Sequence, residues 1–126
     1  MYVYFNNNPQ NNDRAGDCVI RAISAITGDS WEKIYTDLCA EGFAYGDWGN
    51  NNAVWDAYLR SRGFKRYVCP NECAYCYSVA DFANDHKTGK YICASGSHAV
   101  CVISGNWLDS WDSGSVSVIY YYTKEE

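Results

Sequence analysis

A cysteine, a histidine and an aspartate that could share one nucleophilic reaction occur in this order along the chain. The first, Cys18, follows the breaker Gly16 and opens an apolar run, which predicts a helix ending near Thr27-Gly28 with Cys18 in its first turn. Unpaired backbone amides and the helix dipole at that place favour an anion and lower the pKa of a thiol. Cys18 is therefore a candidate nucleophile, although a lone cysteine opening a helix is more often a core residue.

The candidate partners of Cys18 lie on the two arms of a predicted β-hairpin. Its turn falls at residues 104–105 or 105–106, and we prefer the first register. That register places His98 opposite Trp111, with Asp109 on the diagonal and on the same face, within reach of a side-chain hydrogen bond. Asp112 is predicted to lie on the other face.

A histidine oriented by a carboxylate can hold a thiolate in an ion pair and later protonate a leaving amine. We assign His98 as general base and acid, Asp109 as its orienting group, and Trp111 as the aromatic that shields their hydrogen bond from water. The alternative is that His98 and Asp109 form a polar pair on the wet face of a half-exposed sheet.

The order and wording of these motifs resemble the papain-like cysteine peptidases. That family has a cysteine at a helix N-terminus, a histidine opening a strand as HAV, and Asn or Asp in an NSW-type motif. The matching segments here are Cys18 with its helix, His98-Ala99-Val100 and Asp109-Ser110-Trp111. Compact branches that process leader peptides use Asp at the third place. The same segments also resemble a group of small proteins from phages and gut bacteria.

The resemblance implies one papain-like domain over residues 1–126 that cleaves peptide or isopeptide bonds of a peptide or protein substrate through an acyl-enzyme on Cys18, without a cofactor. The family carries an oxyanion-binding glutamine six residues before the cysteine. Asn12 has that place here, with Gln10 or Asn8 as alternatives. Three further possibilities stay open: a cell-wall amidase, an acyltransferase, and a non-catalytic phage protein that binds a host protein on the same scaffold.

The elements that would position these residues are helices first and a sheet second, which indicates an α+β fold with N-terminal helices packed on one face of a C-terminal antiparallel sheet. Apart from the Cys18 helix, helices are expected from a capping box at residues 29–32 to about residue 40, from Asn50–Asn52 to Gly63, and over 78–85. Strands are expected at 1–5, as an edge strand, and at 64–69, followed by a four-stranded meander over 91–94, 98–103, 107–111 and 116–122.

Composition narrows the classes of partner. The 126 residues carry a net charge of -5, and the ten Lys and Arg residues are scattered, so nucleic acid is an unexpected partner. No apolar run reaches the length of a membrane helix, and the N-terminal segment lacks the pattern of an export signal, so a cytoplasmic location is expected. The oligomeric state is left open.

The chain holds seven cysteines, which we expect to be mainly reduced thiols. Cys69, Cys73 and Cys76 lie in the segment CPNECAYC, where a zinc site with a fourth ligand from elsewhere is conceivable. Because the spacing is irregular, we predict that no metal binds there. Cys39 and Cys101 are expected in the core, and His86 at an exposed helix end.

Overall fold

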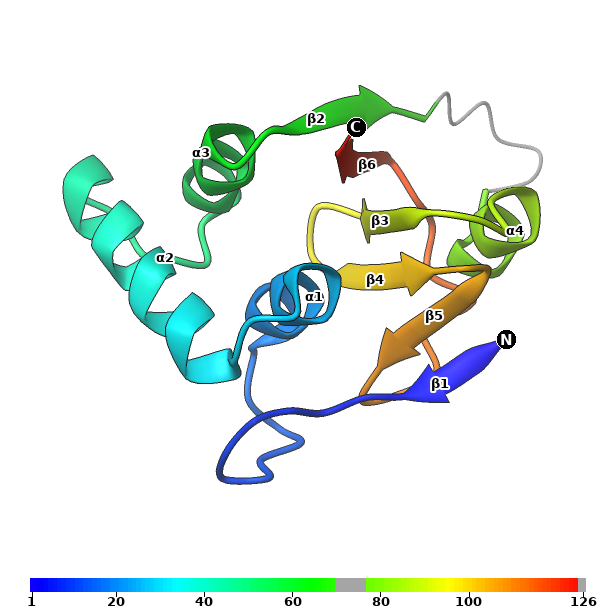
Figure 1. Cartoon of the computed structure of the whole chain (residues 1–126), viewed down its shortest axis with the longest axis horizontal. Coiled ribbons are helices and arrows are strands. Elements are labelled where there is room, and N and C mark those ends of the chain that lie inside the picture. Colours follow the sequence, from blue (N-terminus) through cyan, green and yellow to red (C-terminus); the bar gives the residue numbers. More distant parts are fainter. Residues whose placement is uncertain (70–76, 125–126) are drawn as a thin grey trace.

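The computed structural model describes residues 1–69 and 77–124, and its elements form an α+β fold (Figure 1). The predicted helices and strands are all present, with changes in some bounds. In chain order the elements are β1 (Tyr2–Tyr4), α1 (Cys18–Thr27), α2 (Trp31–Tyr45), α3 (Asn52–Ser61), β2 (Phe64–Val68), α4 (Val79–Asp85), β3 (Lys90–Ala94), β4 (Ala99–Ile103), β5 (Asn106–Asp109) and β6 (Tyr120–Lys124).

The strands form one six-stranded sheet in the order β1-β5-β4-β3-β6-β2. All neighbours are antiparallel except β1, which runs parallel to β5 at one edge. The predicted four-stranded meander is wrong for its last strand: β6 returns to the far side of β3 and lies between β3 and β2. Residues 116–118 stay outside β6, because their backbone bonds instead to residues 77–79 at the start of α4, for example through Val118 N–H to the Tyr77 carbonyl at 2.8 Å.

Two hydrophobic layers cover the sheet. Alternate residues of β4 point to opposite faces, as the pleat requires. Cys101 packs with Ile23 of α1 in a layer that also contains residues of α2 and α3. Val102 packs with Phe82 of α4 on the other face. The expectation that the helices lie on one face is therefore correct for α1 to α3 and wrong for α4.

The hairpin of β4 and β5 has the predicted first register. Cys101 pairs with Leu108 and Val102 with Trp107, across a turn at Ser104-Gly105. Both turn residues have positive φ angles, 51° and 78°, as a two-residue type I′ turn requires. Because this register is fixed, the residues beyond the paired strands meet at the open end of the hairpin.

Helix α2 differs from its prediction. Ser30 caps its first turn through a hydrogen bond from the Lys33 amide, and the helix continues past residue 40 to Tyr45. Gly42 lies inside the helix, where an added Cβ would be 2.6 Å from the Asp47 carbonyl oxygen. This glycine does not end the helix; it makes room for the following loop to return along it.

Three smaller predictions can be compared with the structure. The residue Cys101 is buried as expected, but Cys39 is exposed because the buried face of α2 consists of Ile34, Leu38 and Gly42. His86 is half-buried, not exposed, and its ring stacks on Phe82 at 3.8 Å between centroids. None of the helices in the described residues combines the length and hydropathy that a membrane crossing needs.

Candidate active site

Cys18 is the first residue of α1, as the sequence predicts. The helix begins there because an apolar run, Val19 to Ile26, packs against the sheet, and it ends at Gly28 in the left-handed conformation. The N-cap residue Asp17 makes no capping hydrogen bond with its side chain. The backbone amides of the first turn are thus left without the usual side-chain acceptor, next to a half-buried thiol.

His98 and Asp109 meet at the open end of the β4–β5 hairpin. His98 precedes β4 by one residue and Asp109 ends β5, and the His98 Nε2 lies 2.6 Å from the Asp109 Oδ2. The Trp111 ring lies beside the imidazole, with 4.9 Å between the centroids, and is 49% exposed. All three residues therefore lie together as their strand parity predicts.

The His98 side chain and the Ala99 backbone amide both lie close enough to the Cys18 thiol to lower its pKa. Because Nε2 of His98 is bonded to Asp109, the nitrogen left for the sulfur is Nδ1. The structure thus brings Cys18, His98 and Asp109 together, with His98 between the thiol and the carboxylate.

The electrostatics around Cys18, His98 and Asp109 favour a charged thiolate and a charged imidazole. Burial raises the pKa of the Cys18 thiol, but the hydrogen bonds from His98 and Ala99 and the positive charges of His98 and Arg21 outweigh it, and the pKa is lowered. Burial lowers the pKa of His98, whereas its hydrogen bonds to Asp109 and Cys18 and their negative charges raise it to about 9. The two groups therefore stabilise each other as an ion pair.

Asp109 is almost fully buried, and four donors surround its carboxylate. Apart from His98, they are Arg21 Nη2 at 2.8 Å, Ser113 Oγ at 2.7 Å and the Ser110 amide at 2.8 Å. Burial raises the pKa of Asp109, but these hydrogen bonds and the charges of His98 and Arg21 lower it overall. The carboxylate is consequently held ionised and fixed in position beneath His98.

Arg21 is a member of the site that the sequence reasoning missed. It is 5% exposed, and its guanidinium joins Asp109 to Asp17, which also accepts from Trp31 Nε1 at 2.9 Å and Asn8 Nδ2 at 3.3 Å. The available signal was an arginine inside the apolar run of α1, four residues after an aspartate. Such spacing places both side chains on one face of a helix.

Of the three residues considered for the oxyanion hole, two are exposed and one is buried. The side chain of Asn12 is exposed, its carbonyl oxygen accepts from the Arg14 amide at 2.9 Å, and it does not line the pocket at Cys18. Gln10 is also exposed. Asn8 is buried, and its amide group donates to Asp17, so it supports the ion-pair network behind the site.

Asp112 lies three residues beyond the end of β5, so strand parity does not test its predicted face, and its carboxylate bonds to groups other than His98. Its carboxylate accepts from Trp107 Nε1 at 2.8 Å and from the Gly114 amide at 3.0 Å. Asp112 therefore closes the turn that follows β5.

A pocket of about 220 Å³ opens at the thiol. Its walls come from the start of α1, the start of α3 with Asn52, the loop Gly96–His98 that precedes β4, and Tyr120 of β6. The nucleophile and the imidazole therefore face a space that could hold part of a substrate.

Among the described residues no group of His, Cys, Asp or Glu side chains is arranged to hold a metal ion. The prediction for Cys73 and Cys76 lies outside the described residues, so it stays a prediction. Searches against protein-family models, curated proteins and solved structures found no match for this chain.

Proposed function

We propose that this protein is a papain-like cysteine peptidase or amidase that cleaves peptide or isopeptide bonds through an acyl-enzyme on Cys18. The observation that supports it most is that Cys18 and His98 line one pocket, with His98 bonded to the buried Asp109 carboxylate at 2.6 Å. Each member has the role that its surroundings favour: nucleophile, proton carrier and orienting group.

In the first half of the reaction, the Cys18 thiolate attacks the carbonyl carbon of the substrate. The C–N bond then breaks, the protonated His98 gives its proton to the leaving amine, and a thioester on Cys18 remains. In the second half, His98 takes a proton from water as that water attacks the thioester. The acid product leaves and the ion pair is restored.

The negative charge that develops on the carbonyl oxygen needs hydrogen-bond donors. The Cys18 backbone amide is one, because it opens α1 and the Asp17 side chain does not cap the helix. One such donor contributes on the order of 3 kcal/mol to transition-state stabilisation. The side chain of Asp17 is engaged with Arg21 and Trp31 instead, which keeps its carboxylate from competing for that amide.

The nucleophile must stay reduced to act. None of the five described cysteines forms a disulfide. A reducing compartment such as the cytoplasm is the proposed place of action, since it would preserve the thiolate of Cys18.

The proposal is tested by mass spectrometry of the protein mixed with a peptide thioester or activated peptide ester. We expect an acyl adduct on Cys18 that forms in the wild type and in Cys39→Ala, forms far more slowly in His98→Ala, and is absent in Cys18→Ala. Added glycinamide then distinguishes hydrolysis from acyl transfer, because an acyltransferase would yield the amide product. Equal product formation by wild type and Cys18→Ala would contradict the proposal.

A further inference from the structure

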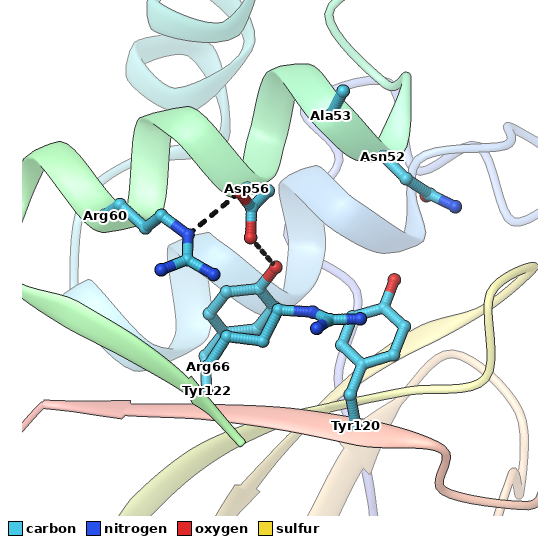
Figure 2. A pocket seen from close by; sticks show the side chains of 7 residues that line it. All are labelled: Asn52, Ala53, Asp56, Arg60, Arg66, Tyr120 and Tyr122. Atoms are coloured by element: carbon cyan, nitrogen blue, oxygen red, sulfur yellow. Dashed lines mark hydrogen bonds and ion pairs between the residues drawn. The ribbon is translucent and has the colours of Figure 1, made fainter. Parts of the chain in front are cut away.

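A second cavity, of about 260 Å³, lies between α3 and the strands β2 and β6, and Figure 2 shows the residues that line it. The two cavities share Asn52 and Tyr120 in their walls. Asn52 Nδ2 donates to the Gly96 carbonyl at 3.0 Å, which ties this shared wall to the loop that carries His98. A substrate bound at Cys18 can therefore extend past Tyr120 into the second cavity.

Arg66 supplies a positive charge to this cavity. It extends from β2 toward Tyr120 (Figure 2), and its guanidinium carbon lies 4.3 Å from the centre of the Tyr120 ring. Within residues 1–69 and 77–124, no carboxylate forms an ion pair with it. The guanidinium is thus held by an aromatic ring and keeps donors for another partner.

The acid of the cavity is already engaged. Asp56 accepts from Arg60 Nε at 3.0 Å and from the Tyr122 hydroxyl, both of which Figure 2 marks. Its charge is balanced by Arg60, so the charge of Arg66 remains, and the cavity carries a net positive charge on a chain with net charge -5. The chemistry of this cavity therefore favours an anion.

We propose that the second cavity is a substrate subsite that binds a carboxylate, with Arg66 as its main specificity-determining residue. This inference rests on the proposed function of Cys18. The carboxylate belongs to an acidic side chain near the reacting bond or to the C-terminus of the substrate, because a guanidinium binds either with two parallel hydrogen bonds. Tyr120 forms the apolar wall against which the stem of that group lies.

The test uses iodoacetyl peptides, which alkylate Cys18 without needing turnover. One set carries Glu or Gln at each of three successive positions with an amidated C-terminus. A second set keeps Gln at these positions and carries either a free or an amidated C-terminus. Mass spectrometry measures the alkylation rate of Cys18. In one of the two sets, the peptide with the carboxylate at one position is expected to react at least about tenfold faster than its neutral counterpart.

The variant Arg66→Gln removes the charge and keeps most of the stem. We expect its carboxylate preference to fall to within about twofold of unity. The matched control is Arg62→Gln, because Arg62 lies over Tyr58 at 4.6 Å but outside both cavities, and this variant should keep the preference.

Equal rates for acidic and neutral peptides in the wild type, or a preference that survives Arg66→Gln, would overturn the subsite. A preference that depends on Arg66 in a protein that hydrolyses none of the corresponding peptides would support the subsite and count against the hydrolase. The two proposals can therefore fail separately.

Discussion

At the scale of single residues, the site depends on a buried carboxylate that is shared between a histidine and an arginine. The sequence allowed Cys18, His98 and Asp109 to be predicted because each lies in a short motif with a local signal, namely a helix start or a hairpin position. Arg21 has only its spacing from Asp17 as a local signal, because its other partner, Asp109, is 88 residues away and only the fold brings the two together. The same holds for Ser113, whose hydroxyl bonds to Asp109.

The first prediction compares two aspartates on the same segment. Asp109→Ala should remove the acceptor that orients His98 and lower turnover by orders of magnitude, whereas Asp112→Ala should affect mainly the turn at Gly114 and stability. The measurement is the rate of both variants on one acyl substrate, with circular dichroism as the folding control. Full activity in Asp109→Ala would rule out its orienting role.

A second prediction concerns Arg21. Arg21→Met should lower the free energy of unfolding by about 3–5 kcal/mol, because it leaves two buried carboxylates, Asp17 and Asp109, without their shared cation. Chemical denaturation measures this loss. The control is Lys33→Met, which breaks an exposed pair with Asp37 and should cost less than about 1 kcal/mol. Similar losses in the two variants would show that the buried network does not stabilise the fold as described.

At the scale of elements, the local signals predicted where helices begin better than where they end. Capping residues such as Ser78, which forms a capping box with Asp81, act within a few residues and can be read directly. The end of α2 depends on a tertiary contact instead: Gly42 lies against the returning loop, and the helix continues to Tyr45. A glycine that breaks a helix and one that accommodates a close contact have the same sequence signature.

For Gly42 we therefore predict that the usual effect of a glycine-to-alanine substitution on stability is reversed. Replacing glycine by alanine inside a helix ordinarily stabilises by about 1 kcal/mol. Gly42→Ala should instead destabilise the protein, because the new Cβ would be 2.6 Å from the Asp47 carbonyl oxygen. Thermal unfolding checks the sign. Gly16→Ala, where no atom lies within 4 Å, serves as the tolerated control, and a stabilised Gly42→Ala protein would contradict the described packing.

At the scale of the whole molecule, the α+β class and the β3–β4–β5 hairpins follow from local patterns, but the position of β6 does not. β6 pairs with β3 and β2, which precede it by about 30 and 55 residues, and strand propensity carries no information about partners at such separations. The site lies at an end of the sheet where β4, β5 and α1 converge, and therefore depends on long-range order.

Charge coupling across the site also affects the stability of the whole chain. The pKa of His98 is raised from 6.5 to about 9, so its contribution to stability is complete below pH 6.5 and is lost as the pH rises to about 9. The lowered pKa of Cys18 has the opposite effect, because its contribution to stability increases as the pH rises. In Cys18→Ser the contribution of Cys18 is gone and His98 keeps its bond to Asp109, so the unfolding free energy should fall as the pH rises above 6.5.

The control for this pH dependence is the double variant Cys18→Ser, His98→Asn. Its unfolding free energy should change less over the same pH range, because the titrating imidazole is gone. Denaturant titrations at several pH values provide the comparison. Parallel pH dependences in the single and double variants would mean that His98 is not coupled to Asp109 as the geometry indicates.

The most direct test of the central claim is the rate at which iodoacetamide alkylates Cys18 at pH 6, with Cys39 as the internal reference. An ordinary thiol is only about 0.3% ionised at that pH. Because His98 stabilises the Cys18 thiolate, we expect Cys18 to react at least about tenfold faster than the exposed Cys39, and this advantage to disappear in His98→Ala. If Cys18 reacted no faster than Cys39 at pH 6, or equally fast with and without His98, the assignment of Cys18 as an activated nucleophile would be contradicted.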